Sequence, residues 1–103
     1  MSGSFSYKLT TENELFTFDY SSIIAATETI LTATCKVQVK EGFDETPNAI
    51  LQGSPAIATP RVTQRVAGGI SGNTYRLEMT VTTSYSNVYT LVGDLPIYTP
   101  LEV

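Results

Sequence analysis

The fold is indicated most clearly by the stretch ILTATCKVQVK, which runs from Ile30 to Lys40. Apolar and polar side chains alternate along it, and a period of two is that of a β-strand with one buried and one solvated face. The apolar face comprises Leu31, Ala33, Cys35, Val37 and Val39, and the polar face comprises Thr32, Thr34, Lys36, Gln38 and Lys40. The stretch therefore predicts a half-buried strand of an antiparallel sheet.

Further strands are predicted on both sides of this stretch. Their expected ranges are Leu15–Tyr20, Arg61–Val66, Thr74–Ser84 and Asn87–Val92. The last range is apolar on both faces, which is typical of a central strand or of one covered by another surface. In the second range Gln64 lies between two apolar residues, so its side chain needs a hydrogen-bond partner inside the fold.

Turn residues separate these strands. Gly68–Asn73 contains three glycines and predicts a loop, because glycine adopts positive φ at little cost. Tyr85–Asn87 predicts a short hairpin turn, and Glu41–Asn48 a polar loop. Pro55 and Pro60 enclose a short piece, Ala56–Thr59, that we expect to be an edge strand or an irregular crossing, since proline cannot donate a ladder hydrogen bond.

Together these segments predict an all-β protein of a single domain. Its 103 residues are close to the usual domain size, and strong turn signals recur about every ten residues. We expect an antiparallel immunoglobulin-like β-sandwich of six to eight short strands, with a partly open small barrel as the alternative. Residues 9–95 would form the domain, residues 1–8 a flexible arm, and residues 96–103 an extended tail.

Composition excludes several classes of function. The chain carries six Lys and Arg against ten Asp and Glu, which argues against binding nucleic acid or an anionic membrane. It has no His, the commonest catalytic base and metal ligand, and we expect neither enzymatic activity nor a cofactor. Its one thiol, Cys35, lies on the apolar face of a strand, where a buried, unreactive side chain is expected. The adjacent acids Asp44 and Glu45 lack the ligand spacing of a calcium loop, so no metal site is predicted.

Apolar and aromatic residues that do not fit the predicted core are candidates for contact with other proteins. Phe43 stands alone in a polar loop, and several tyrosines combine apolar area with a polar tip, as interface residues do. The C-terminal segment is apolar but interrupted by two prolines. The candidate interface residues are Phe43, Tyr85, Tyr89, Ile97, Tyr98, Leu101 and Val103.

Three blocks of sequence resemble those of a known group of proteins. They are FDYSSII at Phe18–Ile24 followed by TETI at Thr27–Ile30, VAGGISGNTY at Val66–Tyr75, and the threonine-rich MTVTTS at Met79–Ser84. Their order is similar to that in small virion proteins of tailed bacteriophages, of the fiber–tail adaptor type. The resemblance spans most of Leu15–Leu91. It departs at Ile23-Ile24, where an aromatic is frequent, over the long segment Gly42–Pro60, and at Tyr85–Asn87.

The resemblance implies a structural protein without catalytic residues. Its partners would be other virion proteins of the tail, neck, fiber or capsid, and it would be assembled in the host cytoplasm into a particle that holds several copies. A tail, neck or fiber adaptor is the first expectation. Decoration of the capsid, as a cement protein, and a carbohydrate- or ligand-binding β module are the alternatives.

Overall fold

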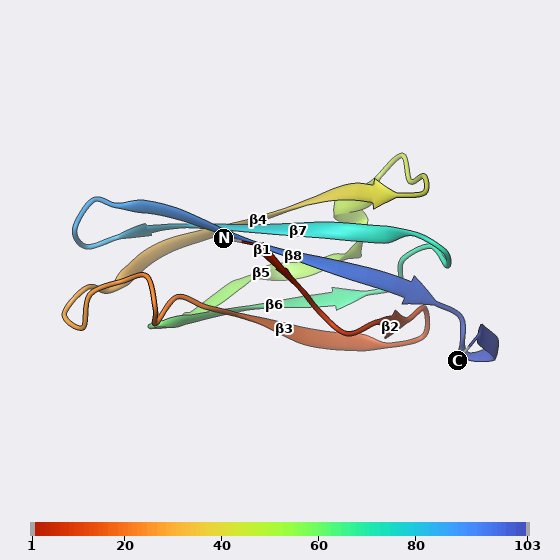
Figure 1. The fold of residues 1–103 in the computed structure, drawn as a ribbon, viewed down its shortest axis with the longest axis horizontal. Helices are drawn as coiled ribbons and strands as arrows, with labels where there is room; N and C mark the ends of the chain where they lie inside the picture. Colours follow the sequence, from red (N-terminus) through yellow and green to blue (C-terminus); the bar gives the residue numbers. More distant parts are fainter. Residues whose placement is uncertain (1, 103) are drawn as a thin grey trace.

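The computed structural model of this protein describes the backbone of residues 2–102 and the side chains of residues 5–102. These residues form two sheets and two short 3₁₀ helices (Figure 1). The strands are β1 (Ser2–Ser4), β2 (Lys8–Leu9), β3 (Asn13–Asp19), β4 (Ile30–Glu41), β5 (Leu51–Ala58), β6 (Arg61–Ala67), β7 (Thr74–Thr83) and β8 (Val88–Tyr98), and the 3₁₀ helices are η1 (Pro47–Ile50) and η2 (Pro100–Glu102). The predicted all-β class is confirmed.

The two sheets face each other in two layers (Figure 1). One has the order β1-β8-β7-β4, with β2 also paired to β8, and the other has the order β3-β6-β5. The long strands pair antiparallel, whereas β1 and β2 run parallel to β8. The sheets do not close into a single barrel, and the immunoglobulin-like strand order stays a prediction.

Alternating side chains of both sheets fill the space between the layers. The alternation in β7 is strict, and its inward residues Tyr75, Leu77, Met79 and Val81 are fully buried. From the smaller sheet come Phe16, Phe18 and Val62, and Tyr20 follows β3. The Tyr20 hydroxyl donates to the Met79 carbonyl at 2.6 Å and so joins the two layers. Burial raises the pKa of Tyr20 to about 12, which keeps this hydroxyl protonated.

Gln64 has the buried position that the sequence predicted. It is 1 % exposed, and its Nε2 donates to the carbonyls of Arg65 at 2.9 Å and Gly53 at 3.2 Å. Among the described residues no partner lies near its Oε1. The amide N–H groups of Gln64 are therefore hydrogen-bonded. The bond to Gly53 holds the irregular middle of β5, where the pairing with β6 shifts between Gln52 and Ala56.

The start of β4 differs from the strict alternation that the sequence predicted. The register of β4 against β7 shifts between Ile30 and Thr32. This bulge turns Ile30 inward, at 5 % exposed, and leaves Leu31 outward, at 60 % exposed. Beyond the bulge the prediction holds, because Val37 is buried and Ala33, Cys35 and Val39 are partly buried.

The N-terminal segment lies along β8, and the C-terminal segment continues from it. Ser2–Ser4 and Lys8–Leu9 pair with it, so the predicted arm has a definite place against the sheet, although Met1 lies outside the described residues. The predicted tail begins inside β8, since Pro96, Ile97 and Tyr98 are its last residues. In the described part of the chain, no helix has the length and apolar character needed to cross a membrane.

Candidate protein-interaction surfaces

The candidate interface residues lie mainly at the two ends of an elongated molecule. Its extents are 46 × 23 × 23 Å, and the connections between long strands gather at the ends of the longest axis (Figure 1). Tyr85 lies in the β7–β8 turn at one end, which we call the hairpin end. Phe43 and Leu101 lie at the other, which we call the terminal end because the chain finishes there.

Phe43 is presented at the terminal end by a loop with a fixed backbone. One amide side chain holds both of its backbone groups: the Phe43 N–H donates to Asn73 Oδ1 at 3.2 Å, and Asn73 Nδ2 donates to the Phe43 carbonyl at 2.9 Å. Asn73 is itself buried, whereas the Phe43 ring is 71 % exposed. An aromatic ring that is exposed on an ordered backbone loses little conformational entropy when a partner covers it.

Tyr75 fixes the same loop from inside the core. Its buried hydroxyl donates to Asp44 Oδ2 at 2.8 Å and accepts the Ile70 N–H at 3.0 Å. Burial raises the pKa of Tyr75, so this hydroxyl keeps the proton that it donates. The β4–η1 loop and the β6–β7 loop are therefore tied to one side chain of β7.

The C-terminal candidates are divided between core and surface. Leu101 is 97 % exposed on η2, and Tyr98 is 37 % exposed and packs its ring edge-on against Tyr7. Ile97 is fully buried between the layers and belongs to the core. Val103 lies outside the described residues. Of the candidate residues, Phe43, Tyr98 and Leu101 are therefore exposed at this end, where Tyr7 and Ile70 are also exposed.

At the hairpin end, a buried carboxylate organises two loops. Glu28 is 3 % exposed; its Oε1 accepts the Ala25 N–H at 3.0 Å, and its Oε2 accepts Asn87 Nδ2 at 3.1 Å and the Thr83 hydroxyl. The hydrogen bond from Thr83, followed by those from Ala25 and Asn87, lowers the pKa of Glu28. The β3–β4 loop is thus joined to the β7–β8 hairpin.

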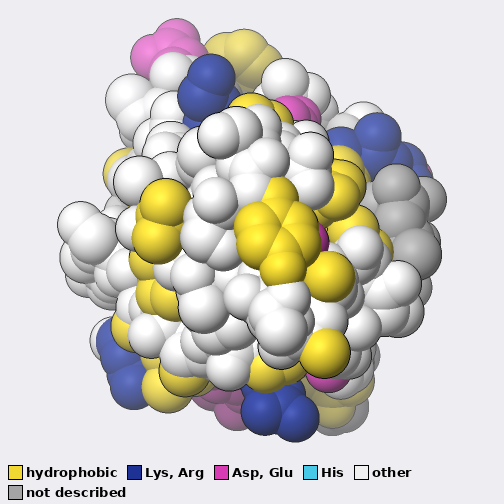
Figure 2. Space-filling view, turned by 90° about the vertical axis from the view of Figure 1, so that its left-hand side faces the viewer, with side chains coloured by type: hydrophobic (Ala, Val, Ile, Leu, Met, Phe, Trp, Pro, Cys, Tyr) yellow, Lys and Arg dark blue, Asp and Glu magenta, His cyan; other side chains and the backbone are white. Residues whose placement is uncertain are grey.

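This organisation leaves apolar side chains at the hairpin end exposed. Tyr85 is 51 % exposed and its hydroxyl meets that of Thr27, while Val88 is 63 % exposed. Tyr89 is only partly buried and packs against the core, so it contributes less surface than Tyr85. Figure 2 shows this end of the molecule, where apolar patches alternate with uncharged polar surface and most charged side chains lie toward the rim.

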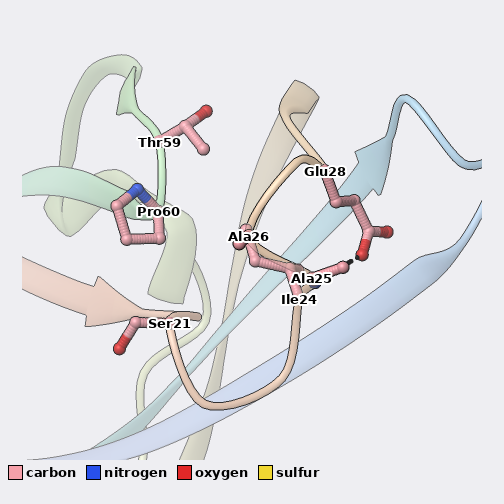
Figure 3. Close-up of a pocket in the computed structure, with 7 residues that line it drawn as sticks. All are labelled: Ser21, Ile24, Ala25, Ala26, Glu28, Thr59 and Pro60. Carbon is pink, nitrogen blue, oxygen red and sulfur yellow. Dashed lines mark hydrogen bonds between the residues drawn. The ribbon is translucent and has the colours of Figure 1, made fainter.

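A hollow of about 310 Å³ opens at the hairpin end. The β3–β4 loop and the β5–β6 turn form its two sides, and its lining residues are Ser21, Ile24, Ala25, Ala26, Glu28, Thr59 and Pro60 (Figure 3). The Glu28 carboxylate is already occupied by its hydrogen bonds to the loops. The lining therefore offers shape and apolar surface, with no set of convergent polar groups of the kind that reaction chemistry requires.

The two ends differ in charge. Apart from buried Glu28, residues 20–30, 58–60 and 83–88 at the hairpin end contain no charged side chain. The terminal-end loops, residues 10–12, 41–46, 68–73 and 99–102, contain only acidic ones, namely Glu12, Glu41, Asp44, Glu45 and Glu102. A partner at the hairpin end meets a neutral surface, whereas one at the terminal end meets a negative field.

Between the ends, the outer face of the larger sheet carries an ion-pair network. Asp94 accepts from Arg76 Nε at 2.9 Å and from Lys40 Nζ at 2.6 Å, which links β8, β7 and β4. These hydrogen bonds, that from Arg76 first, lower the pKa of Asp94 to about 2. The network uses two of the chain's six cations to strengthen the sheet.

The described residues do not assemble a recognisable reactive centre. Within residues 2–102 there is no group of three Cys, Asp or Glu side chains placed to hold a metal ion. Burial, with a smaller effect of Glu78, raises the pKa of Cys35 to about 11, so the thiol is protonated at neutral pH.

Four residues with structural roles were not predicted from the sequence. Glu28 stands alone as a charge in an otherwise uncharged stretch, and this isolation was the available signal for a buried, hydrogen-bonded role. Asn73 directly follows Gly72 at the end of a loop, where an amide often bonds to nearby backbone. Phe5 is partly buried and Lys8 fully buried, but neither gave a signal in the sequence, because their burial depends on the path of the N-terminal segment.

A family model described as "Podophage GP4 fiber-tail adaptor protein gp77" matches residues 8–92, from β2 into β8. No curated protein matches the chain. The matched range includes β2 to β7, the first part of β8 and the loops that connect these strands. The chain therefore belongs to the podophage GP4 fiber-tail adaptor family (gp77), a family of phage tail structural proteins.

Proposed function

We propose that this protein is a non-enzymatic adaptor that holds tail and fiber subunits together in the virion through protein–protein contacts. The family match over residues 8–92 carries the proposal. Particle assembly in the host cytoplasm and several copies per particle are part of it. The domain would supply a rigid two-layered body whose exposed apolar side chains face neighbouring subunits.

The geometry supports a division of labour between the two ends. Phe43, Tyr98 and Leu101 present apolar surface at the acidic terminal end, and Tyr85 presents it at the uncharged hairpin end. A single partner surface cannot complement both in charge, so the two ends suit two different neighbours. We infer that the terminal end contacts a partner with basic residues around an apolar recess, and that the hairpin end contacts a largely uncharged surface.

Particle assembly tests this proposal directly. Phage carrying Phe43→Ser or Tyr85→Ser is expected to yield particles with several-fold less of this protein, because exposed aromatic anchors dominate interface energies. Leu15→Ser is the matched control, since Leu15 is 54 % exposed on the outward face of β3 and lies between the two ends. Quantitative mass spectrometry of purified particles measures the copy number.

The copy number, together with a glycan-binding assay on the purified chain, separates the adaptor from capsid decoration and from a carbohydrate-binding module. A small, ring-like copy number that falls in both end variants supports the adaptor. Hundreds of copies per particle would instead indicate capsid decoration. Unchanged incorporation of both variants, with specific binding of the purified chain to glycans, would indicate a carbohydrate-binding module and would contradict the adaptor role.

A further inference from the structure

One edge of β8 pairs with β7, and the other edge is covered by the chain's own N-terminal segment. We call residues 2–9 the N-terminal arm. Ser2–Ser4 pairs with Val92–Asp94 and Lys8–Leu9 pairs with Ile97–Tyr98, in both cases parallel to β8. The Phe5 N–H donates to the Asp94 carbonyl at 2.8 Å between these two pairings. Without the arm, β8 would present a row of unpaired backbone groups to its surroundings.

A single aromatic side chain anchors the middle of the arm. The Phe5 ring packs between the layers, with its centroid 4.9 Å from that of Phe16 and 5.4 Å from that of Phe18. It also lies directly over Gly93, where a Cβ would come within 2.4 Å of the ring. Gly93 therefore forms a notch in β8 that fits an aromatic side chain on a strand laid along this edge.

Lys8 anchors the second part of the arm, Lys8–Leu9, to the body of the protein. Its side chain is fully buried, and its Nζ donates to the carbonyls of Gly68 at 2.6 Å and of Leu9 at 2.7 Å. The bond to Gly68 joins the arm to the β6–β7 loop of the body. The Gly93 notch, the β8 edge and the Gly68 carbonyl together form an acceptor groove with three separate points of recognition.

The arm is connected to the rest of the fold by one short turn. The Glu12 N–H donates to the Leu9 carbonyl at 3.0 Å, and the Leu9 N–H donates to Glu12 Oε1 at 2.8 Å. Residues 10–12 therefore act as the hinge between the arm and β3. Opening this hinge removes the arm and leaves every pairing among β3 to β8 in place.

We propose that the acceptor groove of one copy binds the N-terminal arm of a second copy. A parallel strand needs no direct turn to its neighbour, so the backbone bonds and the Phe5 contact are the same whichever chain supplies the arm. The balance between a chain's own arm and another's then depends on local concentration and hinge strain. Copies held side by side in a particle would exchange arms, while dilute chains would keep their own.

Cysteine crosslinking between full-length chains tests this inference. In a Cys35→Ser background, one chain carries Leu9→Cys and a differently tagged chain carries Tyr98→Cys, because these positions face each other across the β2–β8 pairing. The chains are mixed, warmed close to their melting transition, cooled and oxidised. We expect a mixed disulfide dimer whose share rises about tenfold for each tenfold rise in concentration while exchange is rare, as mass action requires.

Two controls separate arm exchange from random collision. Leu31→Cys replaces Leu9→Cys in the first, since Leu31 is 60 % exposed at the opposite end of the molecule; it should give little mixed disulfide with Tyr98→Cys. Gly93→Ala in the Tyr98→Cys chain fills the notch and should abolish the dimer. Phe5→Ser in the Leu9→Cys chain tests the same contact from the other side if Gly93→Ala does not fold.

The double variant Leu9→Cys/Tyr98→Cys shows whether the groove and arm meet at all, through an intrachain disulfide. That disulfide with no mixed dimer at any concentration would overturn the exchange. So would particles in which Tyr98→Cys is captured by a different virion protein and never by another copy. Because the purified chain suffices for the main test, its failure leaves the adaptor proposal untouched.

Discussion

At the scale of single residues, Cys35 shows how burial in the fold lowers the reactivity of a thiol. Its pKa of about 11 leaves roughly one thiolate per thousand molecules at pH 8, whereas an unperturbed cysteine with pKa near 8.5 is about one quarter thiolate. Alkylation by iodoacetamide at pH 8 is therefore expected to be roughly a hundredfold slower in the folded protein than in urea. The rate is measured by mass spectrometry. Comparable rates in both states would show that the thiol is neither buried nor perturbed.

Gly42 is the residue on which the presentation of Phe43 depends. Its φ is +100°, and a Cβ there would come within 1.9 Å of Asn73 Oδ1, the atom that accepts the Phe43 N–H. Gly42→Ala thus adds a clash to the cost of positive φ, which is itself about 1–2 kcal/mol. Gly53→Ala is the matched control, because Gly53 also has positive φ but nothing lies within 4 Å of its Cβ position.

We expect Gly42→Ala to lower the free energy of unfolding by at least about 1 kcal/mol more than Gly53→Ala does, since Asn73 loses its hydrogen bonds to the loop. Urea unfolding measures both variants, and amide hydrogen exchange at Phe43 reports the loop directly. Equal losses in the two variants, with unchanged exchange at Phe43, would mean that Asn73 does not hold this loop.

At the scale of elements, the bulge in β4 decides which of two adjacent residues belongs to the core. Ile30→Ala is expected to cost about 2–4 kcal/mol, the usual range for truncating a buried Ile. Leu31→Ala should change the free energy of unfolding by less than about 0.5 kcal/mol, as exposed substitutions usually do. Thermal or urea unfolding of the two variants measures this. A larger loss in Leu31→Ala than in Ile30→Ala would show that the strand alternates strictly and has no bulge at this point.

The same strand shows how far the sequence could predict this structure. Alternation identified four of the long strands, and β8 was predicted in part because its first residues are apolar on both faces. The hairpin at Tyr85–Asn87 followed from turn chemistry, and an edge strand at Pro55 was one of two expectations from proline chemistry. The bulge was not predictable, because one extra residue leaves the composition of a strand unchanged while inverting its faces. The predicted surface position of Ile97 followed from ending the last strand at Val92 and assigning residues 96–103 to a tail, whereas β8 continues through Pro96 to Tyr98.

The interaction surfaces were predictable only in part, for a related reason. Phe43 and Leu101 are exposed apolar residues in polar or proline-rich surroundings, which the sequence displays locally. The Phe5 contact with Gly93 joins residues far apart in the chain and depends on parallel pairing at an edge. Periodicity carries no information about such a pairing, so the N-terminal arm could not be placed from sequence alone.

At the scale of the whole molecule, hydrogen-bonded carboxylates make the free energy of unfolding sensitive to acid. Four described carboxylates accept hydrogen bonds that lower their pKa: Asp94 from Arg76 and Lys40, Glu28 from Thr83 and backbone, Glu102 from Ser71 and Thr99, and Asp19 from Ser21. They lie on the sheet face, at the hairpin end and at the terminal end. Protonation in acid therefore weakens the layered body and both of its ends.

The direction of this effect follows from proton linkage. A carboxylate whose pKa is lower in the folded than in the unfolded state adds stability above its unfolded pKa, and this contribution is lost as pH falls through the folded value. For Asp94 the interval runs from near the ordinary value of 3.8 down to about 2. We expect the free energy of unfolding, measured by urea titration, to decrease between pH 4 and pH 2.

Asp94→Asn identifies the contribution of the sheet network to this acid sensitivity. Solvent screens the partly exposed Arg76 and Lys40, so we expect a loss of about 1 kcal/mol at pH 6 and a smaller difference from the unmodified protein at pH 2. Glu45→Gln, which removes an exposed loop carboxylate, should leave the acid dependence close to that of the unmodified protein. If Asp94→Asn keeps the full decline between pH 4 and pH 2, the ion pairs across β4, β7 and β8 do not contribute to it. The loss of stability in acid would then come from the other carboxylates with lowered pKa, Asp19, Glu28 and Glu102, at the two ends.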